Sequence, residues 1–243
     1  MKTAEEVIRK MQGLADESQQ KVLSRFFKTG KGEYGEGDRF LGIKVPVTRD
    51  IVKQAKDLNL EEIQMLIDSE WHEIRLCGFL ILVSKYEKQP SDEILHFYVR
   101  NAKKANNWDL VDLSVYKIIG KWLTNPEVKE NDKTKLMNQL ANSQNLWEQR
   151  MSVVATMTPI KQGNFTYIWK YGEKAITNKH DLMHKALGWM LREMGKKDKN
   201  QLIRFLEKHH AEMPRTALRY AIERLQKEEK TEWMKKKYAD FAK

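Results

Sequence analysis

The heptapeptide NNWDLVD, residues 106–112, places an indole and a carboxylate four residues apart. That spacing is about one helical turn, so Trp108 and Asp112 are predicted to share one face of a helix. Asn106 or Asn107 is suited to cap the start of this helix. An aromatic ring beside an acid on one face is a combination that can stabilise positive charge on a bound ligand.

The two acids of this segment are not equally easy to explain. Asp109 falls in the expected first helical turn, where the helix dipole favours a carboxylate. Asp112 lies deeper, between Val111 and Leu113, where an ionised side chain is costly unless it is paired or partly hydrated. Asp112 is therefore a candidate catalytic residue. The structural alternative is a buried carboxylate satisfied by an arginine or by a neighbouring helix terminus.

Two later segments repeat an aromatic residue followed by a base. In LWEQR the pair is Trp147 and Arg150, and in GWMLRE it is Trp189 and Arg192. The two residues of each pair are three apart and hence on one helical face. Core packing is the simpler explanation of each tryptophan, and an ion pair between repeats is the simpler explanation of Arg150. Two indoles, a carboxylate and a guanidinium on one basic surface would instead suit a charged ligand.

Other chemistries find little support in the sequence. His72 and Glu73 begin a zinc-protease pattern, but position 76 is leucine and no second histidine follows, so no metal site is expected. A serine nucleophile elbow and a phosphate-binding P-loop are both missing. No cofactor is expected.

The elements that must position these residues read as helices throughout, so the predicted class is all-α. Five helices rich in apolar residues, each preceded by another helix, begin near residues 70, 106, 145, 181 and 212. Paired helices at a period of roughly 30 to 45 residues are typical of an α-solenoid of HEAT-like antiparallel helix pairs. The second helices would then line a concave face, expected to be basic.

Length and composition limit the remaining choices. The 243 residues suit one repeat domain, 1–243, and the formal net charge of +10 favours a polyanionic partner, most often nucleic acid. One cysteine, Cys77, and no signal-peptide or membrane-spanning pattern lead us to expect a cytoplasmic protein without membrane association. A glycine-rich segment at about 28–42 is expected to be a mobile loop, with a loop whose backbone amides order on phosphate as the alternative. Residues about 228–243 are expected to form a solvated tail.

Four segments in this order, FLGIKVP, NNWDLVD, NLWEQR and KALGWMLRE, resemble the AlkD-like DNA alkylation repair family of HEAT-like DNA glycosylases. The resemblance extends from about Phe27 to Arg224. It differs from some active members at the position before the tryptophan, where they carry a second aromatic and this chain has Asn107.

The resemblance implies hydrolysis of the N-glycosidic bond of 3-methyladenine and 7-methylguanine in duplex DNA, the first step of base excision repair. It implies that Trp108, Asp112 and Trp189 are catalytic and that Arg150 contacts DNA. We expect the same contact for Arg192. It further implies a monomer, acting at the nucleoid, that leaves the base in the stack because a solenoid face lacks a deep pocket.

Two alternatives remain open at the level of sequence. One is a non-catalytic HEAT-like paralogue that binds damaged or branched nucleic acid, and the other is a solenoid that binds a protein partner. The basic charge favours nucleic acid over a peptide, and the tryptophan, aspartate and arginine set favours catalysis over binding alone.

Overall fold

The computed structural model describes residues 1–236. Within that range the chain is helical, and extended pairing is confined to one isolated bridge between Arg39 and Trp71. The prediction of an all-α fold is therefore confirmed. None of the helices in the described part is long and apolar enough to cross a bilayer.

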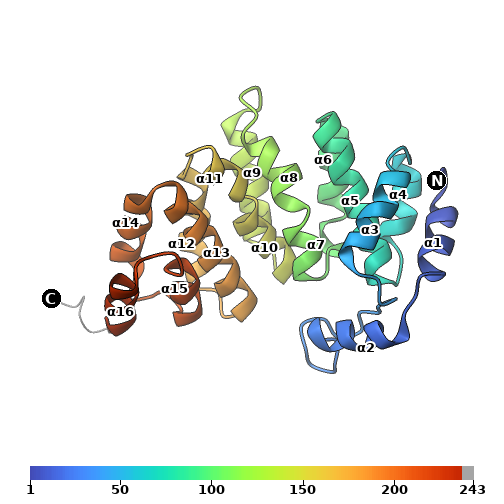
Figure 1. The fold of residues 1–243 in the computed structure, drawn as a ribbon. Coiled ribbons are helices and arrows are strands. Elements are labelled where there is room, and N and C mark those ends of the chain that lie inside the picture. Colours follow the sequence, from blue (N-terminus) through green and yellow to red (C-terminus); the bar gives the residue numbers. More distant parts are fainter. Residues whose placement is uncertain (237–243) are drawn as a thin grey trace. The chain divides into compact units, whose positions relative to one another are not determined.

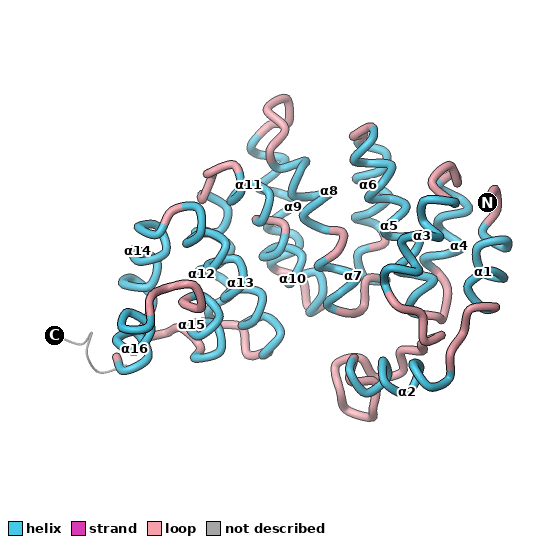
Figure 2. Tube along the Cα trace, viewed as in Figure 1, coloured by secondary structure: helices cyan, strands magenta, loops and turns pink. Residues whose placement is uncertain are grey.

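The chain divides into two compact units, Met1–Ile118 and Ile119–Lys243, and each is described by itself. The single domain expected from the sequence stays a prediction. The helices of the first unit are coloured blue to green in Figure 1 and cyan in Figure 2. They are α1 (Ala4–Gln12), α2 (Glu17–Phe26), α3 (Val45–Gln54), α4 (Leu60–Ile67), α5 (His72–Lys88), α6 (Asp92–Arg100) and α7 (Trp108–Asp112), with a 3-10 turn at Ala102–Lys104.

Helix α8 (Val115–Leu123) follows, and the remaining helices belong to the second unit. They are α9 (Glu130–Ala141), α10 (Leu146–Val154), α11 (Met157–Lys161), α12 (Thr166–Ile176), α13 (Asp181–Lys197), α14 (Lys199–His209), α15 (Arg215–Ala221) and α16 (Lys227–Lys235). The five predicted repeat starts match the starts of α5, α7, α10, α13 and α15, and each of these follows another helix.

Buried apolar faces explain the pairing of these helices. In the first unit α5 packs against α3, α4, α6 and α7, and 13 of its 17 residues are buried. In the second unit α13 has the same central place among α10, α11, α12, α14 and α15. Gly188 permits a close approach to α15, because a Cβ there would lie 2.5 Å from the Ala217 carbonyl oxygen.

The helix that carries the candidate site is shorter than predicted. The pattern LVDLSVYKII predicts one continuous helix, but α7 ends at Asp112 and α8 begins at Val115. Ser114 lies at the break, where its hydroxyl donates to the Leu110 carbonyl (2.5 Å) and contacts the Tyr98 hydroxyl (2.7 Å). Serine hydroxyls that bond the preceding turn compete with regular helix. Asp112 is consequently the last residue of a short helix.

The two segments expected to be irregular differ from expectation. The glycine-rich segment connects α2 and α3 without a helix, but its second half is packed, since Asp38, Phe40, Leu41 and Ile43 are buried. The expectation of a mobile loop is therefore wrong for that half. The predicted solvated tail is also wrong at its start, because 227–235 form α16 with Trp233 buried. Residues 237–243 of that tail lie outside the described residues.

Candidate active site

Trp108 and Asp112 stand at opposite ends of α7, and both side chains are half-buried. Asn107 caps the helix through its side-chain oxygen, which accepts from the Trp108 amide (2.9 Å). The two side chains line the same pocket, as their four-residue spacing predicts. The short helix therefore presents an indole and a carboxylate together.

This pocket has a volume of about 460 Å³, within the range of small-molecule sites. All its lining residues belong to the first unit: Leu23, Phe26, Phe27, Phe40, Ile43, Lys44, Val45, Pro46, His72, Glu73, Leu76, Trp108, Asp109, Asp112 and Leu113. Apolar and aromatic side chains predominate among them. Phe26 of α2 and Phe40 of the glycine-rich segment add walls beside α7.

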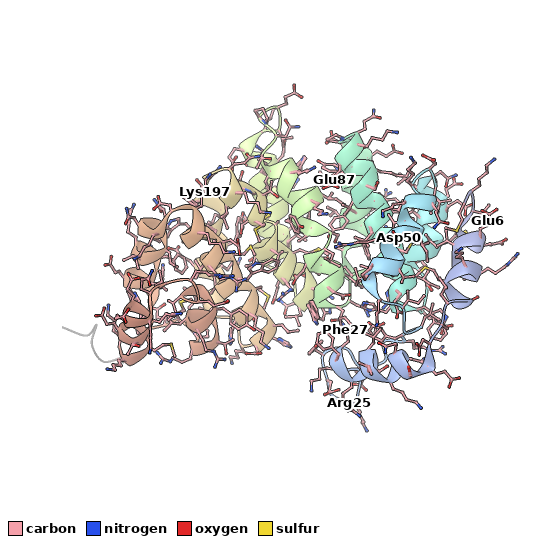
Figure 3. All side chains as sticks on the ribbon, viewed as in Figure 1. Glu6, Arg25, Phe27, Asp50, Glu87 and Lys197 are labelled. Carbon is pink, nitrogen blue, oxygen red and sulfur yellow. The ribbon has the colours of Figure 1, made fainter. Side chains whose placement is uncertain are left out.

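Four aromatic rings pack together between α2 and α7. Phe27 stacks on Trp108 (centroids 5.2 Å apart, planes at 20°) and on Phe40 (5.0 Å, 19°). Phe26 meets Trp108 edge to face at 5.9 Å and is 60% exposed. In Figure 3, Phe27 points toward the helices of this unit, whereas Arg25 points away. Trp108 is thus held from one side by stacking while part of its surface stays accessible.

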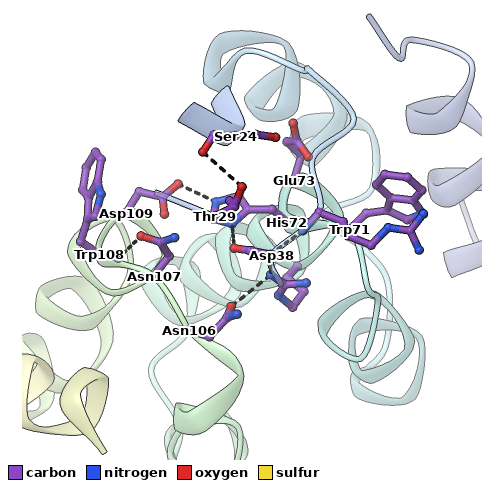
Figure 4. Close-up of polar contacts among 12 residues, drawn as sticks. Ser24, Thr29, Asp38, Trp71, His72, Glu73, Asn106, Asn107, Trp108 and Asp109 are labelled. Atoms are coloured by element: carbon purple, nitrogen blue, oxygen red, sulfur yellow. Dashed lines mark hydrogen bonds and ion pairs between the residues drawn. The ribbon is translucent and has the colours of Figure 1, made fainter. Parts of the chain in front are cut away.

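Behind these rings, His72 joins the glycine-rich segment to α7. Its Nδ1 donates to Asp38 Oδ2 (2.7 Å) and its Nε2 donates to Asp109 Oδ2 (2.9 Å), as Figure 4 shows. Burial lowers the pKa of His72, but the attraction of Asp109 and the hydrogen bonds with both carboxylates raise it to about 9. His72 is therefore a buried cation at neutral pH.

Asp38 is the second anchor of this network. Burial raises the pKa of Asp38, but the hydrogen bond and charge of His72 and the paired Arg75 outweigh it and leave the pKa below its usual value. Arg75 also donates to Asn106 Oδ1 (3.0 Å) and to the Ser69 carbonyl (2.9 Å). Asp38, which follows α2, and Asn106, which precedes α7, are therefore both bonded to Arg75 in the first turn of α5.

Glu73 fixes the end of the glycine-rich segment. Its carboxylate accepts from the amides of Leu41 (2.9 Å), Gly42 (2.9 Å) and Ile43 (3.0 Å). Gly42 adopts φ 88° and lies against the backbone of Asp16, where a Cβ would come within 2.2 Å of the carbonyl oxygen. This wall of the pocket consequently depends on glycine at position 42.

Sequence reasoning missed this network. Local pattern places His72 and Glu73 only in an incomplete zinc motif, and Asp109 only in the first turn of a helix. A signal was nevertheless present, because histidine, glutamate and Arg75 at the start of a strongly apolar helix must find polar partners when buried. The partner Asp38 is 34 residues away in an irregular segment, so its identity could not be read from spacing.

The structure places Arg150 in the interior of the second unit. It lies on α10, is 4% exposed, and its guanidinium donates to the Leu182 carbonyl at the start of α13. Trp147, one turn earlier, is buried as the packing explanation predicts. Arg150 thus connects two neighbouring repeats through at least one backbone contact.

Trp189 and Arg192 lie on α13, and both are half-buried. The Arg192 guanidinium pairs with Glu223, and its Nε lies 3.6 Å from Glu193. Because these residues belong to the second unit, the prediction that they share one face with Trp108 and Asp112 stays a prediction. Within residues 1–236, no three His, Cys, Asp or Glu side chains are grouped to hold a metal ion.

Comparison with known proteins gives one family. The model of the family described as DNA alkylation repair enzyme matches residues 7–225. The chain belongs to this family. A solved structure titled predicted DNA alkylation repair enzyme from Enterococcus faecalis is similar in fold, with a TM-score of 0.68 and 17% identity over 88% of this chain and 97% of that one. No curated protein matches the sequence.

Membership of the DNA alkylation repair enzyme family gives the geometry a biochemical setting. Membership of this family indicates that the protein is a DNA repair enzyme and that its partner is DNA. A chain with 44 basic and 34 acidic residues is electrostatically suited to that partner. Trp108 and Asp112 line one pocket of the first unit.

Proposed function

We propose that this protein is a DNA glycosylase that hydrolyses the N-glycosidic bond of cationic alkylated purines, 3-methyladenine and 7-methylguanine, in duplex DNA. The observation that carries the proposal is the pairing of Trp108 and Asp112 across one turn of α7, beside a pocket, in a chain of the DNA alkylation repair family. We further propose that it acts as a cytoplasmic monomer.

The chemistry explains why a carboxylate and an indole would act together. Alkylation at N3 or N7 gives the purine a positive charge and makes it a good leaving group, so no general acid is needed. As the bond breaks, positive charge develops on the deoxyribose. An ionised Asp112 at about 4 Å would stabilise that charge by about 4 kcal/mol at an effective dielectric near 20. That corresponds to roughly a thousandfold in rate.

The same carboxylate can orient the attacking water on the opposite side of the sugar from the base. Trp108 would contact the sugar with its ring, adding a cation–π stabilisation of about 1 to 2 kcal/mol. We assign the same kind of contact to Trp189. Arg150 and Arg192 are proposed to contact DNA. Both already have partners in the second unit and Arg150 is buried, so the contribution of each to DNA affinity is expected to be small.

The decisive experiment is a base-release assay on methylated duplex DNA. We expect free 3-methyladenine and 7-methylguanine from the wild type, and a loss of roughly a thousandfold in 7-methylguanine excision for Asp112→Asn. Asp57→Asn is the matched control, because Asp57 is an exposed aspartate in the turn between α3 and α4. DNA affinity should be nearly unchanged in both variants.

Two results would contradict the proposal. Excision by Asp112→Asn at the wild-type rate would remove Asp112 from the reaction. A mobility shift with methylated DNA without base release by the wild-type protein would instead support the non-catalytic, nucleic-acid-binding alternative.

A further inference from the structure

Helix α2 presents an exposed face that combines apolar and basic side chains. None of its ten residues is buried, and Figure 1 shows the helix joined to α1 and α3 by irregular segments. Val22 and Phe26, at 57% and 60% exposure, are the two most exposed large hydrophobic side chains of residues 1–236. They are one helical turn apart, so they lie side by side. An amphipathic helix normally buries such a stripe, and here it is left open to another molecule.

The basic side chains of this face are also available. Lys21 and Arg25 are exposed and one turn apart, and neither side chain makes an ion pair or a hydrogen bond within residues 1–236. In Figure 3, Arg25 points away from the helices of its unit. From Ser18 to Lys28 the chain carries three bases and no acid. Unpaired cations gathered on an exposed helix indicate an anionic partner.

The apolar half of the face leads directly into the candidate active site. Phe26 meets Trp108 edge to face at 5.9 Å, and both line the pocket beside α7. Around the helix, Val22 follows Phe26, because successive residues are turned by about 100°. The pair Lys21 and Arg25 lies beyond Val22. A DNA strand that offers a sugar to Trp108 can therefore continue across the two apolar side chains to the two bases.

A nucleic-acid backbone suits this order of side chains. Its phosphates are anionic and its sugars present apolar edges, so one strand can use both halves of the face. An acidic peptide would satisfy the bases as well, but the face continues into the pocket of a protein whose family acts on DNA. The observations therefore favour DNA as the occupant.

We propose that α2 is a DNA-contacting arm, in which Lys21 and Arg25 bind phosphates next to the lesion and Val22 and Phe26 pack against the neighbouring sugars. This inference deepens the proposed function and rests on duplex DNA being the substrate. The contact is made to the backbone alone, so it leaves the bases stacked. It places part of the DNA interface outside the second helices of the repeats, which the solenoid prediction assigns to the concave face.

The test measures the affinity for a short unmodified duplex by fluorescence anisotropy at several salt concentrations. Each phosphate contact that is lost lowers the slope of log affinity against log salt by about 1, so the double variant Lys21→Ala, Arg25→Ala should lower it by about 2. The double variant Arg9→Ala, Lys10→Ala is the matched control. Arg9 and Lys10 are exposed on α1, and their side chains likewise make no ion pair or hydrogen bond within the described residues.

A second variant tests the apolar half of the face. Phe26→Ala should weaken binding of the duplex by about tenfold, the value of one buried phenyl ring, at every salt concentration. The salt slope should stay at the wild-type value, because no charge is removed. Met65→Ala, which truncates an exposed apolar side chain of α4, is the control and should bind as the wild type does.

An unchanged salt slope in Lys21→Ala, Arg25→Ala, or an equal fall in the control pair, would overturn the assignment. The outcome is separate from that of the glycosylase assay. Base release from methylated DNA together with an unchanged slope would leave the glycosylase function standing and remove α2 from the DNA interface. A reduced slope in a protein that releases no base would support the DNA-contacting arm and contradict the glycosylase.

Discussion

The two tryptophan-bearing helices, α7 and α13, are held in place by different physical means. Helix α7 has five residues, and its first turn is bonded through Asp109 to the buried His72 cation and from there to Asp38. Helix α13 has 17 residues and is held mainly by packing, with Gly188 against the backbone of α15. A short helix has little apolar surface to bury, so charge and hydrogen bonds must position it instead.

This contrast predicts that removing a buried charge destabilises the first unit more than any comparable substitution on α13 destabilises the second. In His72→Leu, Asp38 and Asp109 would remain buried without their shared cation, and removal of one partner from a buried ionic group costs about 3–5 kcal/mol. We expect that loss in the free energy of unfolding measured in urea. The control His184→Leu removes a half-buried histidine of α13 that contacts the Asn178 carbonyl, and should cost about 1 kcal/mol. Equal losses in the two variants would contradict the contrast.

The pH dependence of stability provides the next largest effect. The pKa of His72 is raised from 6.5 to about 9, so the folded protein holds this proton more tightly than the unfolded chain does. The resulting stability is fully present below pH 6.5 and is lost as pH rises through about 9, on the order of 3 kcal/mol in total. Urea unfolding at intervals between pH 6 and 9.5 measures it. His72→Leu should show a flatter profile, and identical slopes would assign the pH dependence to other groups.

The smallest effect is expected for the packed helix, and it should not depend on pH. In Gly188→Ala the added methyl group meets the Ala217 carbonyl oxygen and Tyr220 Cβ, both at 2.5 Å, which forces α13 and α15 apart. Overpacking of this kind costs about 1–3 kcal/mol. Thermal unfolding measures the loss.

Gly172→Ala is the control for this substitution. There the nearest atoms are the ends of the Ile168 and Leu187 side chains, both at 3.3 Å, which can move. The gain in helix propensity from glycine to alanine, about 1 kcal/mol, should offset the tighter contact and leave stability nearly unchanged. A large loss of stability in Gly172→Ala, with none in Gly188→Ala, would contradict the claim that α13 and α15 need glycine at position 188 to pack closely.

Some of the site could be predicted from local spacing. Trp108 and Asp112 share a pocket because four residues span one helical turn, whatever surrounds the helix. Asn107 caps α7 through its side-chain oxygen, as its place at the expected start of the helix indicates. The break after Asp112 was missed because it depends on Ser114 bonding within the fold, with Tyr98 as its partner.

The pocket could not be predicted from local spacing either, because it also depends on contacts between residues far apart in the chain. Its walls come from α2, the glycine-rich segment, α3, α5 and α7. For the glycine-rich segment, composition predicts a mobile loop. What anchors that loop is Glu73, whose carboxylate accepts from three of its amides across about 30 residues of chain. Interactions across such separations carry no periodic signal in the sequence.

By itself the sequence determined the helical class, the order of the paired helices and the face that Trp108 and Asp112 share, because these follow from the 3.6-residue repeat and from capping residues. The tertiary structure alone decided that His72 would be a buried cation, that α7 would end at Asp112 and that an aromatic pocket would form beside it. Each of these depends on which distant groups meet in an interior of low dielectric, where an unpaired charge is too costly to leave.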